Sequence, residues 1–350
     1  MTYAPTNPPY PGYPSYQQSP WPAPLPGIQP VKKKSWMPRL IIIVSVFVIA
    51  GPLIASMLSS EPKPTPTPTP PTTANVPPTT PAPTHSGSGA PGTYTPGPPD
   101  LHPDDPPFPE TDTEVTMSLE NNPLYTESLI PTQCEITNID LVNAPVADIE
   151  EHMNEFVDCL METWYAPVYD AGFTLPHPSV TVYTTEINSA CGQLPIYNAA
   201  YCTADQQIYY GKQLILAFPS SMQAMRFLAE SVIAHEFGHA VQYRSMILAS
   251  EYYRETSADT DAASMDFSRR LELQADCFAG SFMNAVSAST DLTDQDEANI
   301  VSFFTSIGGT TPYSDDHGTG ANRAFWVTEG MHDWSVGTCN TFTAPDDEVG

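Results

Sequence analysis

Two histidines and a glutamate lie within one short stretch of the sequence, in an order suited to metal chemistry. The segment Ser231 to Met246 reads S-V-I-A-H-E-F-G-H-A-V-Q-Y-R-S-M, so His235 and His239 stand four residues apart and Glu236 follows the first. Residues four apart share one face of a helix, where two imidazoles can bind one metal ion. Glu236 is then placed to take a proton from a water molecule that the metal activates, as zinc hydrolysis requires.

The residues around this motif favour a helix that holds the motif in the interior. No proline occurs between Ser220 and Thr311, and apolar residues flank the motif. The alternative is that H-E-x-x-H arose by chance on a buried helix. Buried polar groups without partners are costly, so a cluster of them in an apolar helix favours a metal site. The apolar residues are Phe227, Leu228, Val232, Ile233 and Val241.

A third ligand must come from another part of the chain. Catalytic zinc usually has three protein ligands, and the metzincin pattern would place the third at position 245. Gln242 and Ser245 occupy the glycine and histidine positions of that pattern, which excludes the class. A glutamate from a second helix is the remaining common solution.

Two segments with the spelling E-x-x-A-D compete for this role. Glu255 to Asp259 lies in polar, turn-like sequence, whereas Glu272 to Asp276 begins an apolar helical stretch. The second can press its acidic side chains toward the His235 helix, so we expect Glu272 to be the third ligand. Asp276, one turn on, is expected to hydrogen-bond a ligand histidine and fix its tautomer. Its alternative is a plain acid on the helix surface.

Several blocks in order resemble the bacterial family called putative neutral zinc metallopeptidase, a gluzincin-like group. They are H-E-F-G-H-A-V-Q, E-L-Q-A-D-C-F-A-G, D-H-G-T-G-A-N-R-A-F-W and C-N-T-F, and the likeness covers roughly Cys191 to Phe342. The resemblance implies a Zn²⁺ ion held by His235, His239 and Glu272, with Glu236 as catalytic acid and base. It also implies proteolysis.

The third block carries a further likeness. Membrane zinc proteases of the CaaX-processing type have a histidine followed six residues later by an arginine, the spacing of His317 and Arg323 here. By that analogy, His317 or Arg323 stabilises the oxyanion of the tetrahedral intermediate. The alternative is that His317 caps the helix beginning near Asn322 and that Arg323 pairs with an acid. The other histidines lack a partner at ligand spacing and are expected on the surface; they are His85, His102, His152, His177 and His332.

The pattern of helices and strands around these residues predicts an α+β, zincin-like domain. It is mostly helical and has a small sheet that contains antiparallel strands. Strands are expected at 179–185 and in a hairpin of 207–210 with 214–218, which by analogy to zincin clefts could pair with an extended substrate. Further helices are expected, in addition to the one that carries H-E-x-x-H, at 147–169, 267–286, 294–307 and 322–329.

The N-terminal part predicts a membrane-anchored protein. Residues 1–38 are rich in Pro and Tyr and predict a disordered cytoplasmic tail; 39–59 predict a transmembrane signal anchor, whose apolar run is long enough for a bilayer of about 30 Å. The apolar run is 40–58, and Lys32 to Lys34 and Arg39 precede it, which favours a cytoplasmic N-terminus. A cleaved signal peptide is the alternative. A Pro/Thr-rich linker (60–111) and the extracytoplasmic catalytic domain (112–350) follow.

All six cysteines fall in this outer domain, where an even number favours disulfides. Cys191 and Cys202 bracket a short loop and form the first expected pair. Cys134 with Cys159 and Cys277 with Cys339 are the other two, although six cysteines allow fifteen pairings.

The charge of the chain limits the partners that the protein can bind. The net charge of −28 argues against nucleic acid as a partner, since phosphate binding needs a positive surface. The expected partners are a protein or peptide substrate, the lipid bilayer and the cell wall. The sequence predicts an endopeptidase. Two alternatives are a catalytically silent, zinc-containing scaffold at the wall and a zinc hydrolase of peptidoglycan amide bonds.

Overall fold

The computed structural model describes residues 94–309 and 316–350. The predicted tail (1–38), the predicted signal anchor (39–59) and most of the predicted linker, up to residue 93, lie outside the described residues. Among those that are described, no helix has the length and the apolar character that crossing a membrane requires.

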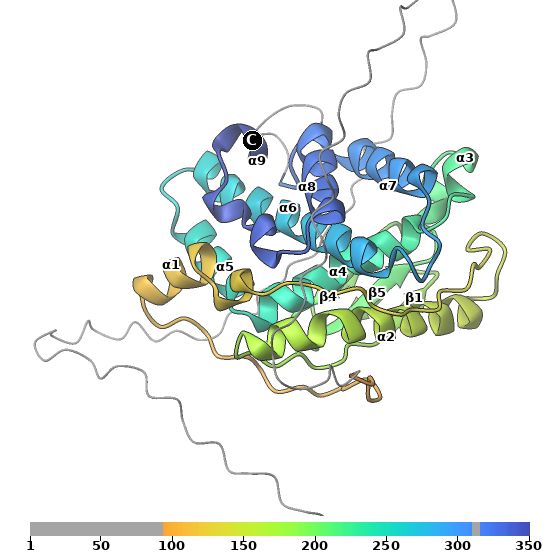
Figure 1. Ribbon diagram of the computed structural model, residues 1–350, viewed down its shortest axis with the longest axis horizontal. Coiled ribbons are helices and arrows are strands. Elements are labelled where there is room, and N and C mark those ends of the chain that lie inside the picture. The colour runs from red at the N-terminus through yellow and green to blue at the C-terminus, as the bar shows by residue number, and fades with distance from the viewer. Residues whose placement is uncertain (1–93, 310–315) are drawn as a thin grey trace, which may run out of the picture. The chain divides into compact units, whose positions relative to one another are not determined.

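Helices dominate the described part of the chain and accompany a small sheet, so the fold is of the α+β class (Figure 1). The helices are α1 (Asp112–Glu120), α2 (Val146–Asp170), α3 (Ser220–Gln223), α4 (Leu228–Arg244), α5 (Ile247–Ser257), α6 (Asp261–Val286), α7 (Asp294–Ile307), α8 (Gly320–His332) and α9 (Asp346–Val349). The strands are β1 (Val180–Tyr183), β2 (Ile187–Ser189), β3 (Gly192–Leu194), β4 (Ala199–Cys202) and β5 (Gln207–Gly211). Short 3-10 helices cover Pro123–Thr126, Ile215–Ala217, Val336–Cys339 and Thr341–Thr343.

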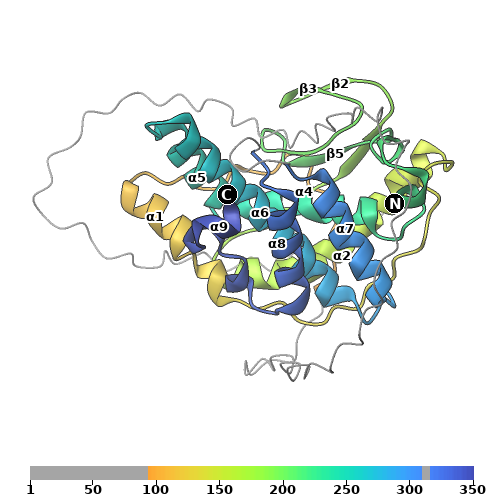
Figure 2. The same cartoon turned by 90° about the horizontal axis from the view of Figure 1, so that it is seen from above.

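The helix α4 is the structural centre of this domain. Every one of its residues is buried, because α2, α5, α6 and α7 and the strands β4 and β5 all pack against it (Figures 1 and 2). Phe227 before it and Met246 after it have φ angles of +64° and +68°, an uncommon conformation for residues other than glycine that turns the chain sharply at both ends. A helix enclosed in this way holds its polar side chains in the interior.

A mixed three-stranded sheet lies beside α4, in the order β1–β5–β4. β5 pairs with β1 in parallel and with β4 in antiparallel fashion. The outer edge of β1 is satisfied by α2, because Asn154 and Glu150 accept hydrogen bonds from the backbone N–H groups of Val180 and Val182. The strands β2 and β3 form a separate antiparallel hairpin (Figure 2).

The predicted hairpin of 207–210 with 214–218 is wrong. The antiparallel partner of β5 is the preceding strand β4, and the apolar residues after Gly211 form the 3-10 helix Ile215–Ala217. A short apolar run does not distinguish a strand from a buried helical turn, which explains the error. Since β5 is flanked by strands on both sides, it cannot pair with a substrate either.

The other predicted elements agree with the structure in kind. The predicted helix 294–307 has the bounds of α7, and 147–169, 267–286 and 322–329 fall within α2, α6 and α8. One segment differs, because Glu255 lies in α5 and not in a turn. Its polar sequence still forms a helix because tertiary packing against α1 and α6 overrides weak local propensity.

The helices α6 and α8 cross at very short distance. A Cβ atom added at Gly330 would lie 2.0 Å from the carbonyl oxygen of Cys277, so only glycine allows this approach. Gly330 lies near the end of α8, and in the first turn of the same helix Arg323 reaches Asp276 of α6.

The stretch 94–111, called the N-terminal strap below, is the described part of the predicted linker, and it lies on the folded domain. The ring of Tyr94 stacks on Tyr165 with centroids 3.8 Å apart. The carbonyl oxygens of Asp100 and Asp104 accept hydrogen bonds from Gln207 Nε2 at 2.9 Å and Arg244 Nη1 at 2.7 Å. This part of the Pro-rich stretch is therefore bound to the domain that follows it.

Three disulfides cross-link the domain, in the pairs expected from the sequence. Cys134–Cys159 joins the chain before α2 to that helix, and Cys191–Cys202 closes the segment between the β2–β3 turn and β4. Cys277–Cys339 joins α6 to the C-terminal segment.

Candidate metal centre

The two histidines of α4 lie on one face of the helix, one turn apart. Both side chains are buried, and their ring centroids are 4.8 Å apart. Gly238 lies between them on the face toward α6, where an added Cβ atom would come within 3.2 Å of the Cα atom of Ala275. The absence of a side chain at this position lets the backbone of α6 approach α4 closely.

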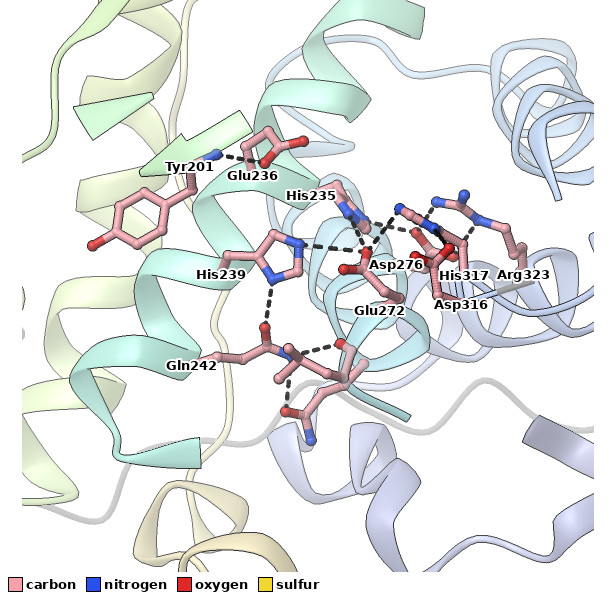
Figure 3. A network of polar contacts seen from close by, with 12 residues as sticks. Tyr201, His235, Glu236, His239, Gln242, Glu272, Asp276, Asp316, His317 and Arg323 are labelled. Carbon is pink, nitrogen blue, oxygen red and sulfur yellow. Dashed lines mark hydrogen bonds and ion pairs between the residues drawn. The ribbon is translucent and has the colours of Figure 1, made fainter. Parts of the chain in front are cut away.

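This close packing places Glu272 of α6 opposite the histidines (Figure 3). Its Oε2 atom lies 3.2 Å from His235 Nε2 and 3.5 Å from His239 Nε2. Within residues 94–309 and 316–350, these three residues are the one group of three or more His, Cys, Asp or Glu side chains with the spacing of a metal site. Glu255, the rival for the third ligand, does not belong to the group.

The spacing and chemistry of these atoms fit a zinc ion. Zinc–ligand bonds of about 2.1 Å place neighbouring ligand atoms of a tetrahedron about 3.4 Å apart, close to the distances observed. Glu272 Oε2 is buried and makes no hydrogen bond, although a buried carboxylate oxygen needs a partner. Two imidazoles and one carboxylate are a ligand set that zinc accepts, so the residues present fit this metal.

The electrostatics of the group keep Glu272 ionised. Burial would raise the pKa of its carboxyl group, but the neighbouring His317 and His239 lower it well below its usual value. For His235, burial would lower the pKa, but the neighbouring carboxylates of Asp276 and Glu272 raise it to about 10. The carboxylates thus give this buried site a strong preference for a positive charge.

Glu236 extends from α4 toward the sheet, away from Glu272. Its Oε2 atom accepts a hydrogen bond of 2.7 Å from the backbone N–H of Tyr201 in the edge strand β4, which the figure shows on the far side of the histidines (Figure 3). Its Oε1 atom is buried and makes no hydrogen bond. Burial raises the pKa of this carboxyl group against the lowering effect of both histidines. A carboxylate held by one oxygen, with a raised pKa, suits a proton acceptor.

Asp276 lies directly behind His235. Its Oδ1 atom is 2.8 Å from His235 Nδ1, and the guanidinium of Arg323 donates to both carboxylate oxygens. Arg323 is fully buried and also lies over the ring of Phe304 at 5.4 Å. The structure therefore places Arg323 on an acid, which was the alternative to an oxyanion role.

His317 reaches the same cluster from the loop before α8. Its Nε2 atom lies 3.5 Å from Glu272 Oε2, and its Nδ1 atom lies 2.6 Å from Asp316 Oδ1. It does not cap the helix, because α8 has Thr319 as its N-cap residue, whose side chain accepts from the backbone N–H of Asn322. The side chain is thus directed at the candidate metal centre.

The second histidine has a partner that sequence reasoning missed. Gln242 Oε1 lies 2.8 Å from His239 Nδ1, and its Nε2 donates to Leu271 O and to Gln274 Oε1 (Figure 3). The spacing of three residues from His239 to Gln242 places both on one helix face and was the available signal. In the sequence, Gln242 served only to exclude the metzincin pattern.

The remaining described histidines lie elsewhere, and two of them are not on the surface as expected. His152 is buried in a pair with Glu230 at 2.8 Å, and His177 is buried against the carbonyl oxygen of Gly97 at 2.6 Å. Their partners are distant in sequence, so spacing could not reveal the burial. His102 and His332 are exposed, and His85 lies outside the described residues.

Comparisons with known proteins agree with this geometry. Residues 137–342 match the model of a family described as "Putative neutral zinc metallopeptidase". The chain is 28% identical over 194 residues to the "Uncharacterized protein YpfJ" of Escherichia coli strain K12, which covers 52% of this chain and 67% of that protein.

Mycobacterial relatives give a similar result. The chain is 29% identical over 202 residues to the "Uncharacterized protein Mb2605" of Mycobacterium bovis and to the "Uncharacterized protein Rv2575" of Mycobacterium tuberculosis, which covers 50% of this chain and 65% of each relative. The match thus spans slightly less than two thirds of these mycobacterial proteins. No solved structure matches the chain.

Proposed function

Because the chain belongs to the Putative neutral zinc metallopeptidase family, we propose that it is an endopeptidase whose Zn²⁺ ion is held by His235, His239 and Glu272. The family match implies zinc, and the three side chains converge with the spacing that this ion needs. The packing of α4 between a three-stranded sheet and α6 supports the zincin-like arrangement expected from the sequence.

One observation supports catalysis over mere metal storage. Glu236 is fully buried beside the ligand histidines, and its Oε1 atom makes no hydrogen bond. Zinc binding does not need this carboxylate, and burying it without a role carries a desolvation penalty. A proton acceptor next to the metal ligands is what the hydrolysis of a peptide bond requires.

The proposed mechanism assigns each step to a side chain. When bound, zinc supplies a Lewis acid that polarises a carbonyl group and lowers the pKa of water to about 7. Glu236 takes the proton of the attacking water at Oε1, while the N–H of Tyr201 holds Oε2 in place. Glu236 then returns this proton to the leaving amine.

His317 is the candidate for stabilising the oxyanion. Its ring faces Glu272, and its Nδ1 is oriented by Asp316. Burial and Arg323 lower the pKa of His317, but Glu272 and Asp316 outweigh them and raise it. A raised pKa favours a ring that donates a hydrogen bond. For Arg323, whose Nε and Nη2 donate to Asp276, we propose a positioning role in place of the oxyanion role.

We also propose that this domain lies outside the cytoplasm on a membrane anchor. The support is the apolar run 40–58 behind a basic stretch, and the three disulfides of the domain, which persist in oxidising compartments. The Pro/Thr-rich linker can hold the domain away from the bilayer, toward the cell wall and its proteins or peptides.

The test compares Glu236→Gln with Glu255→Gln in the full chain. We expect Glu236→Gln to retain one zinc per chain and to lose peptide-library cleavage by a factor of about 10² to 10⁴, because the proton acceptor is gone. Glu255→Gln, outside the ligand group, is expected to cleave like the wild type, and a chelator is expected to stop cleavage by the wild type and by Glu255→Gln.

Three outcomes would contradict the proposal. A wild-type chain that binds zinc and cleaves no peptide in the library would leave the scaffold role. Hydrolysis of purified wall fragments without cleavage of peptides would identify a hydrolase of peptidoglycan amides. Undiminished cleavage by Glu236→Gln would remove Glu236 from the mechanism.

A further inference from the structure

We propose that Gln242 and Gln274 form a chain of amides that fixes the tautomer of His239, so that the ring presents an unprotonated Nε2 to the metal. This inference rests on the zinc site of the proposed function. It assigns two positioning residues that neither the family description nor the sequence motif identifies.

The orientation of Gln242 follows from its backbone neighbour. One end of the side-chain amide lies 2.8 Å from the carbonyl oxygen of Leu271, which can only accept a hydrogen bond. That end must therefore be Nε2, and the end facing the ring of His239 at 2.8 Å must be Oε1. The second hydrogen of Nε2 points to Gln274 Oε1 at 3.1 Å. Both hydrogens of Nε2 make hydrogen bonds, so the reverse orientation of the amide would lose them.

Gln274 is oriented by the same logic. Its Nε2 lies 3.0 Å from the backbone carbonyl oxygen of Cys339, which again only accepts, and 2.9 Å from the hydroxyl of Tyr125. Its Oε1 therefore faces Gln242 as an acceptor. Both glutamines are fully buried, so water does not compete for these groups. Two backbone carbonyls thus determine the direction of the whole chain of hydrogen bonds.

The consequence falls on His239. Gln242 Oε1 can only accept, so His239 Nδ1 must be the donor and carry a hydrogen. A neutral imidazole has one such hydrogen, which leaves Nε2, the atom 3.5 Å from Glu272 Oε2, in the form that binds a metal. The ring of His235 is oriented in a different way, since its partner Asp276 is a carboxylate held by an arginine.

A purely structural role explains only part of this arrangement. The bond from Gln242 to Leu271 O ties α4 to α6, and any buried donor at position 242 would do the same. A tie between helices does not require the amide oxygen to face the ring of a metal ligand. The neutral amide also orients this ring without adding a second carboxylate next to the ligand set.

The test measures zinc affinity in the full chain by competition with a chelator of known affinity. Gln242→Met removes the acceptor at similar volume, and loss of such an outer partner is expected to weaken zinc binding 10- to 100-fold. Gln242→Glu keeps an acceptor for His239 Nδ1 but loses both donors. It is expected to bind zinc within about five-fold of the wild type while its melting temperature falls.

Gln274 provides an internal check, because it acts through Gln242. Gln274→Met is expected to weaken zinc binding by a smaller factor, and the double variant is expected to be no weaker than Gln242→Met alone. The control is Asn122→Leu, which removes a buried amide that donates to the carbonyl oxygen of Ser245 at the end of the same helix. It should lower the melting temperature and leave zinc affinity unchanged.

The inference is overturned if Gln242→Met binds zinc within two-fold of the wild type, or if Gln242→Glu loses as much affinity as Gln242→Met. An equal loss of zinc affinity in Asn122→Leu would also overturn it, because general destabilisation would then explain the effect of Gln242→Met. Zinc affinity is measured without any substrate. A chain that binds zinc but cleaves no peptide would therefore contradict the proposed function, while the affinities of the glutamine variants could still be compared. A wild-type chain without zinc would defeat both.

Discussion

Arg323 donates two hydrogen bonds to Asp276, from Nε to Oδ2 at 2.8 Å and from Nη2 to Oδ1 at 2.7 Å. The two residues lie on α8 and α6, and neither side chain is exposed. Asp276 Oδ1 is in turn 2.8 Å from His235 Nδ1. An ion pair at this depth holds the side chain of Asp276 in place beside His235 Nδ1.

Removing the guanidinium is expected to affect both stability and metal binding. Arg323→Met leaves Asp276 as a buried charge without its main partner, which costs about 3–5 kcal/mol of unfolding free energy. Zinc affinity should fall at least ten-fold, because Asp276 is no longer oriented toward His235. The control is Arg269→Met, since Arg269 is also buried but bonds Val349 O and Asp266. It should lower stability alone, as read by denaturant unfolding, and equal zinc affinities in both variants would contradict the role of Arg323.

The third ligand can be tested by zinc content. Glu272→Ala removes one of the three converging atoms and is expected to reduce bound zinc far below one ion per chain at micromolar metal. Glu255→Ala changes the same residue type in the same E-x-x-A-D spelling and is expected to retain the ion. Metal analysis of both purified full-length variants decides the matter, and loss of zinc only in the Glu255 variant would reverse the assignment.

The Cys277–Cys339 disulfide should support the metal site as well as the fold. Cys277 follows Asp276, and the carbonyl oxygen of Cys339 accepts from Gln274. Replacing both cysteines by serine opens a loop with a sequence separation of 62 and should remove about 4 kcal/mol of stability, together with zinc affinity.

The matched control for this prediction is the pair Cys191→Ser and Cys202→Ser. Its loop has a sequence separation of 11, so the stability loss should be about 3 kcal/mol. Zinc affinity should stay unchanged, because neither cysteine bonds to a residue behind the ligands. Chelator competition on both double variants checks the difference, and equal affinities would separate the disulfide from the metal site.

Glu251 should make stability depend on pH. Burial, followed by the nearby Glu255 and Glu272, raises the pKa of this carboxyl group well above 4.5. The folded protein therefore binds this proton more tightly than the unfolded chain, so the group destabilises the fold increasingly as pH rises above about 4.5. Glu251→Gln should melt higher than the wild type at pH 7 to 8, by about 2–4 °C for each kcal/mol of charge burial removed.

The gain from Glu251→Gln should shrink toward zero near pH 4, where the wild-type carboxyl is protonated in both states. Thermal unfolding across this range gives the difference directly. Glu255→Gln is the comparison, and its gain should be smaller because Glu255 is only partly buried. A constant difference between wild type and Glu251→Gln at all pH values would contradict the titration of Glu251.

The part of the site that depends on local spacing could be predicted from the sequence. His235 and His239 share a helix face by their separation alone, and Glu272 and Asp276 do so on a second apolar helix. The predicted helix 294–307 ends at the glycines that follow Ile307, a helix stop signal, and it has the bounds of α7.

What the sequence could not supply depends on contacts between distant segments. The partner of Arg323 follows from the crossing of α6 and α8 at Gly330, and the donors of Gln274 and Gln242 end on backbone carbonyls whose positions no side-chain pattern reveals. The mixed pairing of β5 likewise joins β1, almost thirty residues earlier, as Val180 faces Ile208. Apolar runs such as 214–218 indicate burial but not the conformation in which it occurs.

The N-terminal strap sets where the protein can be shortened without damage. A soluble fragment cut at residue 112, just before α1, would strip away the carbonyl groups to which Arg244 and Gln207 donate, and would uncover Tyr165. Arg244 lies at the end of α4, the helix that carries His235 and His239, and Gln207 lies at the start of the middle strand β5. Expression of the folded domain should therefore begin at or before Tyr94.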